Sequence, residues 1–332
     1  MKRIDLENHF YDQCLINALA ERLEPPCYLP SDDLICWTDA ISMPQGPLLQ
    51  TLLEVGEERL ALMERRGITH AVLSCSPGAE QLDAEDSIRV CRATNAALHE
   101  LTKRYPGRIF GSAILPVKDV DAAIDELERC VRDYGFVAWH THSNYGTTAP
   151  DHPRYRPLFQ KAAELGVYVY LHPQLPEGER YEGYGFTFAG PGLGFTVDTV
   201  TTLLRMVVSG LLDETPTLKL VLGHLGEGLP FLMERIENRI QFLPNPMLRC
   251  KKELSYYFKH NIWVTTSGNM SKEAFQCTKD VLGIDHILFA SDYPFESVED
   301  MTNFVDALPL TSEERAKLSY ENAETILGIP AQ

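Results

Sequence analysis

Short apolar runs of β-branched and aromatic residues recur along the chain, and several of them stop at a polar residue. The run at residues 167–171, Val-Tyr-Val-Tyr-Leu, is followed directly by His172. Runs of this length without polar alternation are typical of strands buried on both faces of a parallel sheet. The pattern predicts eight such strands, at residues 4–6, 68–74, 108–115, 135–141, 167–171, 218–222, 261–265 and 286–290.

The stretches between these runs have the spacing of amphipathic helices. Helices are predicted at residues 55–66, 84–104, 120–133, 155–165, 197–212 and 228–242. Gly67, Gly135 and Gly166 follow predicted helices at the position where a helix commonly ends in a left-handed residue. Alternating strands and helices indicate an α/β protein with a parallel sheet, and eight repeats suit closure into a (β/α)8 TIM barrel. Because such a barrel takes about 250 residues or more, we expect residues 1–332 to form one domain.

Two segments do not follow the repeat and are predicted to be loop insertions. Residues 25–47 are rich in Pro and Asp, and residues 176–194 combine six glycines with several aromatic side chains. Long loops in compact domains are usually either functional or poorly ordered. Because the second segment follows soon after His172, it is expected to form an aromatic wall over a pocket, the alternative being a surface loop.

The formal charge of −17 argues against partners that are recognised through Lys and Arg. Nucleic acids and anionic membranes are therefore not expected partners. The amino terminus lacks the apolar stretch of a secretory signal, and no run approaches the roughly 18 apolar residues that span a bilayer, so we expect a cytoplasmic protein. Eight cysteines without Cys-x-x-Cys spacing are expected to be reduced core thiols.

Four polar residues beside predicted strand ends have the side chains of a metal site, although each of them alone could be structural. Glu7 and His9 follow the first strand and, being two residues apart, can face the same side. His172 follows the fifth strand and Asp292 the eighth. The carboxyl ends of barrel strands surround one active-site mouth, so these side chains are expected to converge. Two imidazoles and two carboxylates suit one divalent ion, Zn²⁺ or Mn²⁺.

A second group of candidates could move protons or bind substrate. His224 ends the sixth strand between Gly223 and Gly226, which allow the backbone to turn sharply toward the cleft. It is a candidate proton shuttle, and Glu227 either orients its imidazole or is an ordinary charge at the start of the next helix. Arg235 lies in a run of charges and is either a clamp for a substrate carboxylate or part of a solvated helix face.

Five motifs at these positions resemble the amidohydrolase superfamily. They are Leu-Glu-x-His-Phe from residue 6, Leu-His-Pro from residue 171, Gly-His-Leu-Gly-Glu-Gly-Leu-Pro from residue 223, Thr-Thr-Ser-Gly-Asn from residue 265 and Ser-Asp-Tyr-Pro-Phe-Glu from residue 291. The similarity covers about residues 3–324 and is greatest to the nonoxidative decarboxylases of hydroxybenzoates, such as γ-resorcylate and 2,3-dihydroxybenzoate decarboxylases. It implies Glu7, His9, His172 and Asp292 as metal ligands, His224 and Glu227 as the catalytic or carboxylate-handling pair, and Arg235 as a substrate-carboxylate contact.

The chain departs from the superfamily pattern at two places. Glu7 stands where the commonest pattern has the first His of His-x-His, which favours the decarboxylase branch over the hydrolases. On the fourth strand, resorcylate-type enzymes tend to have an Asn where this chain has Trp-His-Thr-His from residue 139. His140 and His142 either enter the pocket and alter ring specificity or are ordinary strand and loop residues. We expect His142 and Phe295, which belongs to the last motif, to contact the substrate.

The favoured function is reversible release of CO₂ from an ortho-hydroxylated aromatic acid, with Asp292 delivering a proton to the ring carbon. The rival is metal-dependent hydrolysis of a lactone, amide or ester, with Asp292 as general base and His224 stabilising the oxyanion. A third hypothesis is a barrel that keeps its metal but only binds a small ligand or serves in assembly. The expectation of a homodimer or homotetramer comes from the resemblance alone.

Overall fold

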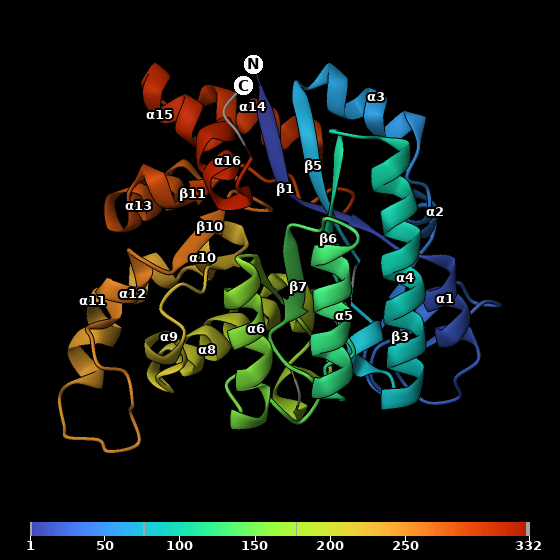
Figure 1. Ribbon diagram of the computed structural model, residues 1–332, viewed down its shortest axis with the longest axis horizontal. Coiled ribbons are helices and arrows are strands. Elements are labelled where there is room, and N and C mark those ends of the chain that lie inside the picture. Colours follow the sequence, from blue (N-terminus) through green and yellow to red (C-terminus); the bar gives the residue numbers. More distant parts are fainter. Residues whose placement is uncertain (1, 76, 177, 330–332) are drawn as a thin grey trace.

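The computed structural model describes residues 2–75, 77–176 and 178–329, and its centre is a sheet of eight parallel strands (Figure 1). Each strand pairs with the next one along the chain. All eight lie at the predicted positions, and the prediction of a (β/α)8 barrel is confirmed. The strands are β1 (Arg3–Phe10), β5 (Ile68–Cys75), β6 (Ile109–Ala113), β7 (Ala138–His142), β8 (Tyr168–His172), β9 (Leu220–Leu222), β10 (Ile262–Thr265) and β11 (Ile287–Leu288).

Backbone hydrogen bonds between β1 and the segment after β11 close the barrel. The Leu6 amide donates to the Phe289 carbonyl at 3.2 Å, and the Asp292 amide donates to the Glu7 carbonyl at 3.0 Å. A parallel bridge between Asn8 and Tyr293 continues this seam. The first strand, β1, and the segment that follows the last strand, β11, therefore lie side by side and complete the circle of strands.

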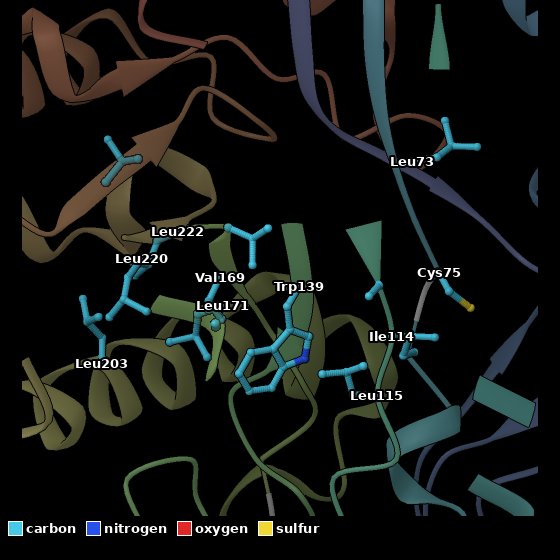
Figure 2. Close-up of a cluster of buried hydrophobic side chains, with 14 of the residues drawn as sticks. Leu73, Cys75, Ile114, Leu115, Trp139, Val169, Leu171, Leu203, Leu220 and Leu222 are labelled. Carbon is cyan, nitrogen blue, oxygen red and sulfur yellow. The ribbon is translucent and has the colours of Figure 1, made fainter. Parts of the chain in front are cut away.

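Side chains alternate between the barrel interior and the layer under the helices. On β8, Tyr168 and Tyr170 belong to the interior cluster, whereas Val169 and Leu171 belong to the larger outer core. Figure 2 shows this outer layer, where Trp139 lies among leucine and valine side chains of the strands and helix α8 (Gly194–Val208). This layer contains most of the buried apolar side chains, and apolar burial is the dominant favourable term in folding.

The predicted helices are present with small changes of boundary. The helix predicted at residues 197–212 is shorter, because Gly210 adopts a left-handed φ of 81° that separates α8 from α9 (Leu211–Glu214). The remaining predicted helices are α3 (Glu57–Arg65), α4 (Ala84–Arg104), α5 (Val120–Arg132), α6 (Arg156–Leu165) and α11 (Leu229–Ile240). Further helices are α1 (Gln13–Ala20), α2 (Pro47–Leu53), α12 (Leu254–Phe258), α13 (Lys272–Leu282), α14 (Val298–Ala307), α15 (Ser312–Ala316) and α16 (Asn322–Leu327).

Both segments predicted as insertions contain short regular elements. The first forms a small antiparallel sheet of β2 (Cys27–Leu29), β3 (Leu34–Cys36) and β4 (Ser42–Pro44). The second contains single helical turns, including α7 (Gly185–Thr187). Among the residues described, no helix has both the length and the apolar character needed to cross a membrane.

A β-bulge in β1 sets which of its side chains face the barrel interior. Asp5 pairs with Ala71 and Asn8 with Leu73, so β1 has one extra residue between these pairs. A bulge of this kind places two consecutive side chains on one face. Leu6 therefore stays in the interior cluster, and Glu7 also faces inward, above it. Asn8 points outward, toward α3.

Arg59 of α3 fixes the carboxyl end of β1 from outside the barrel. Its side chain is only 2% exposed, and its guanidinium donates to Asn8 Oδ1 at 2.8 Å and to the His9 carbonyl at 2.6 Å. It also donates to the Thr51 carbonyl at 2.8 Å and lies over the Tyr293 ring. One planar cation thus connects α3, β1 and the closing segment.

We expect Arg59→Lys to lower the free energy of unfolding by about 3 kcal/mol, because one ammonium cannot replace several guanidinium bonds in a buried site. Urea unfolding followed by circular dichroism measures this change. The matched control is Arg65→Lys on the exposed face of the same helix, which should change stability by no more than about 0.5 kcal/mol. Equal unfolding midpoints for the two variants would contradict the role given to Arg59.

Candidate metal centre and active site

A cavity of about 770 Å³ opens at the carboxyl ends of the strands. Five predicted site residues line it: His172, His224, Glu227, Asp292 and Phe295. Glu7 and His9 lie beneath them in the barrel, with relative exposures of 1% and 0%. The active-site mouth is therefore at the end of the barrel where the sequence predicts it.

The four predicted metal ligands, Glu7, His9, His172 and Asp292, face one another, and we call them the ligand cluster. His9 Nε2 lies 3.6 Å from Glu7 Oε1 and 3.2 Å from Asp292 Oδ1, and His172 Nε2 lies 3.8 Å from Glu7 Oε1. Donors that bind one ion at about 2.1 Å are separated by roughly 3.0–3.4 Å. The spacing of the cluster is close to what a single divalent ion needs.

Unpartnered polar atoms support the same conclusion. Glu7 Oε1, His9 Nε2 and Asp292 Oδ1 are buried and have no hydrogen-bond partner among the described residues. Burying such groups without partners costs free energy, and charged groups cost most. Because all three atoms point to one place, a divalent cation would satisfy them together. The residues present therefore fit a metal ion.

Neighbouring groups orient the ligand cluster. The Tyr170 hydroxyl donates a hydrogen bond to Glu7 Oε2, which leaves Oε1 free to face the centre. The Nδ1 atom of His172 lies 2.7 Å from the Pro173 carbonyl, so it is the protonated nitrogen and Nε2 keeps its lone pair. His9 Nδ1 lies 3.3 Å from Ser74 Oγ, and this contact orients the ring so that Nε2 faces the centre of the ligand cluster. Such outer contacts hold ligands in the geometry that the ion requires.

The cluster attracts positive charge strongly. Burial lowers the pKa of His9, but the carboxylates of Asp292 and Glu7 close to the ring outweigh burial and raise the pKa to about 9. Burial raises the pKa of Asp292, but His224 and His9 hold it well below its usual range. Burial and the neighbouring His9 lower the pKa of His172. Two carboxylates therefore act on one centre, and a bound cation would take the place of the proton on His9.

A second group of residues joins His224 to the ligand cluster. His224 Nδ1 lies 2.6 Å from Glu227 Oε1, and Thr196 of α8 donates to Glu227 Oε2 at 2.7 Å. On the other side of the ring, His224 Nε2 lies 3.5 Å from Asp292 Oδ2. Burial lowers the pKa of His224, but Glu227 and Asp292 raise it well above its usual value. His224 is thus held as an imidazolium between two carboxylates.

A left-handed turn presents His224 and Glu227 to the cavity. The segment marked α10 in Figure 1 (His224–Glu227) has positive φ throughout, with 54° at His224, 55° at Leu225 and 57° at Glu227. Non-glycine residues in this conformation cost about 1–3 kcal/mol each and tend to occur at functional sites. Helix α11 begins only at Leu229. Glu227 therefore lies in the turn. The alternative that it is a charge at the start of the next helix is wrong, because that helix begins two residues later.

Two predicted substrate contacts do not lie at the cavity wall of this chain. Arg235 is exposed on α11 and is not a lining residue, which corresponds to the solvated helix face considered as its alternative. His142 is fully buried, with Nδ1 2.5 Å from Glu80 Oε2, and it is not a lining residue either. His140 lies near the ligand cluster: one of its ring nitrogens and one each of His9 and His172 all lie within 4.8 Å of one another.

Sequence reasoning missed several residues that build the site. Tyr170 could have been found, because it lies two residues before His172 and so faces the same side of β8. Gly268 adopts a φ of 61°, and a Cβ there would lie 2.7 Å from Cδ2 of His224, so only glycine leaves room for the ring. Glu80 and Thr196 have no local pattern that marks them, because only the folded chain brings them to His142 and Glu227.

The chain is similar to known proteins in both sequence and structure. A family model described as amidohydrolase matches residues 36–329. A γ-resorcylate decarboxylase from Rhizobium sp. (strain MTP-10005) is 34% identical, and the alignment covers 98% of each chain. The crystal structure of a 2,6-dihydroxybenzoate decarboxylase in complex with 2,6-dihydroxybenzoate has a TM-score of 0.87 and 32% identity, over 99% of each chain.

A second solved structure is a dihydroxybenzoic acid decarboxylase from Polaromonas sp. JS666, which contains manganese and the inhibitor 2-nitroresorcinol. Its TM-score is 0.86 at 30% identity, over 100% of this chain and 98% of that one. These neighbours share the fold over the whole barrel.

Loss of the hydrogen bond between Tyr170 and Glu7 should weaken metal binding. Tyr170→Phe removes the donor that orients Glu7, and loss of such an outer partner typically weakens metal binding by about 10- to 100-fold. Competition titration with a chromophoric chelator measures the affinity without any substrate. The control is Tyr168→Phe on the same strand, because the Tyr168 hydroxyl has no hydrogen-bond partner among the described residues. Unchanged affinity in Tyr170→Phe would show that Glu7 does not depend on this contact.

Proposed function

The chain belongs to the amidohydrolase family, and from this we propose that it is a metal-dependent decarboxylase that releases CO₂, without oxidation, from an ortho-hydroxylated aromatic acid. The single observation that carries the proposal is the contact of the ligand cluster with the His224–Glu227 pair through Asp292. The decarboxylase relatives, which match over the whole chain, support the reaction class.

The ring must gain a proton before the carboxylate leaves. Direct loss of CO₂ would leave an aryl carbanion with no group to stabilise it, whereas protonation of the carboxyl-bearing carbon makes CO₂ departure restore the aromatic ring. An ortho hydroxyl supplies electron density for this protonation. A divalent ion held by the ligand cluster would supply Lewis-acid chemistry and orient the carboxylate and the hydroxyl.

Asp292 has the two contacts that a proton-delivering residue needs. Its Oδ1 faces His9 in the ligand cluster, and its Oδ2 faces His224 Nε2 at 3.5 Å. Contact with Asp292 and Glu227 raises the pKa of His224, and contact with His224 lowers the pKa of Asp292, so this pair favours the proton on the imidazole. His224 is therefore the proton reservoir, Asp292 Oδ2 passes the proton to carbon, and Glu227 holds the imidazole in place.

We propose that the metal ion is Mn²⁺ or Zn²⁺. Imidazole suits zinc, carboxylate oxygen suits manganese, and the ligand cluster contains two of each. The Polaromonas neighbour contains manganese, which supports this ion. Elemental analysis of protein purified without chelator identifies the resident ion, and reconstitution of the metal-free protein with each ion identifies the one that restores activity.

We expect Asp292→Asn to lower kcat by about 10²- to 10⁴-fold, because the amide cannot deliver the proton. Metal content should fall much less, since the amide oxygen keeps a donor toward the ion. Release of CO₂ from 2,6-dihydroxybenzoate and elemental analysis measure the two effects separately. Asp300→Asn, an exposed position in the first turn of α14, is the matched control and should keep its activity.

Solvent isotopes separate decarboxylation from hydrolysis. In D₂O the product should carry one deuterium at the carbon that held the carboxylate, because the delivered proton exchanges with solvent. Hydrolysis of a lactone, amide or ester would instead place ¹⁸O from H₂¹⁸O in the product. Mass spectrometry that finds ¹⁸O and no carbon-bound deuterium would overturn the decarboxylase proposal in favour of the hydrolase.

We propose further that the chain forms a homodimer or homotetramer. Helix α11 and the loop after it project from the barrel in Figure 1, and three large apolar side chains there are exposed, Phe231 at 82% and both Phe242 and Leu243 at 67%. Exposed apolar patches of this kind commonly mark contacts between proteins. A symmetric contact would bury each such patch in a second copy.

Phe231→Gln should therefore shift the assembly toward smaller species at a given concentration, with the protein still folded. Sedimentation velocity measures the distribution. Leu23→Gln is the control, because Leu23 is 98% exposed and lies far from α11 in the sequence. If the sedimentation of Phe231→Gln matches that of the control, self-association does not use this surface.

A further inference from the structure

The cavity is much larger than one dihydroxylated ring requires. Its volume of about 770 Å³ lies in the upper part of the range of about 300–1,000 Å³ that pockets for drug-sized ligands occupy. A monocyclic acid bound at the ligand cluster would fill only the part nearest the strand ends. The remaining space has its own wall, and the residues of that wall determine what it can hold.

The two inserted segments and the residues that flank them supply most of the apolar lining residues, together with the polar residues Ser42, Gln45 and Thr187. Trp37, Met43 and Leu48 come from residues 37–48, in and just after the first segment, and Leu175, Phe186 and Phe195 come from the second segment and its flanks. We call these six residues the apolar subsite. Trp37, Leu175, Phe186 and Phe195 also belong to one hydrophobic cluster that packs the two segments together. The wall is therefore part of a packed unit.

The charged residues that line the cavity differ in position from the apolar ones. The acidic and imidazole lining residues come from the ends of strands or from the segments that follow them, and they are His172, His224, Glu227, Asp292 and Glu296. Among the described residues that line the cavity there is no Lys or Arg. A second anionic group on the ligand would find no counter-ion near the apolar subsite, and burying it there would be costly. An uncharged hydrocarbon group would instead gain by leaving water.

We propose that the apolar subsite binds an uncharged alkyl or aryl substituent, carried by the aromatic acid at the ring position opposite its carboxylate. The inference rests on the proposed decarboxylation, which directs the carboxylate and the ortho hydroxyl toward the ligand cluster. The ring position para to the carboxylate then points away from the ligand cluster, into the remaining part of the cavity, whose lining residues include Met43 and Phe186. The substrate class is accordingly an ortho-hydroxylated aryl acid with an apolar tail.

A homologous series tests the proposal. Decarboxylation of 2,6-dihydroxybenzoate is compared with that of its 4-methyl, 4-propyl and 4-pentyl derivatives, with kcat/KM as the readout. Each buried methylene should raise kcat/KM by about three- to fourfold until the subsite is full. A flat or falling series, with the unsubstituted acid still turned over, would overturn the subsite and leave the proposed function intact.

Binding of the products separates failure of the subsite from failure of the proposed reaction. If no acid in the series releases CO₂, the proposed function fails, and calorimetric titration with resorcinol, 5-propylresorcinol and 5-pentylresorcinol still tests the subsite. Affinity that rises with chain length supports an apolar subsite without any turnover. Affinity that does not rise overturns it.

A substitution at Met43 tests where in the cavity the apolar substituent binds. Met43→Gln keeps the length of the side chain but adds an amide to the apolar wall, and it should reduce the ratio of kcat/KM for the 4-pentyl acid to that for the unsubstituted acid by about tenfold. Because the readout is a ratio within one variant, a partial loss of folded protein does not affect it. Leu23→Gln, at the 98% exposed position, should leave the ratio unchanged. An unchanged ratio in Met43→Gln would remove Met43 from the subsite.

Discussion

The site depends on the seam where β1 meets the segment after β11. Buried Asp5 accepts hydrogen bonds from the Ser291 amide at 2.9 Å and from the Ser291 hydroxyl at 2.5 Å. Next to it, the Asp292 amide donates to the Glu7 carbonyl at 3.0 Å. These bonds join residues from opposite ends of the chain and set the separation between Asp292 and the ligands on β1. Without barrel closure, the carboxylates of Glu7 and Asp292 would not face the same point in the ligand cluster.

The closed barrel also holds conformations that an isolated peptide would not keep. His224, Glu227 and Asp292 all have positive φ, and the cost of these conformations must be offset by packing elsewhere. The packing is visible at Gly268, which allows close approach to the His224 ring, and in the outer core between strands and helices. His224, Glu227 and Asp292 are therefore held by a rigid scaffold, as the proposed proton transfer over short distances requires.

The two ends of the cavity perform different physical tasks. Near the strand ends, buried carboxylates and imidazoles interact at low dielectric, where charge interactions are strong and pKa values shift. Further out, the two inserted segments supply apolar side chains, which would favour apolar groups on a ligand through burial from water. The proposed reaction would therefore take place at the strand ends, and the proposed selection of substituents would depend on the inserted segments, which suits a fold whose function changes through its loops.

The sequence by itself determined the eight strands, most of the helices and the residues at the strand ends, because periodicity and turn residues are local properties. It placed Glu7 and His9 on one face, and the closed barrel brings them to His172 and Asp292. Only the tertiary structure decided which other polar residues reach the cavity. Arg235 faces solvent because of the rotation of α11, and His142 is turned toward Glu80. Such contacts depend on how distant elements pack together, and no local pattern in the chain encodes that packing.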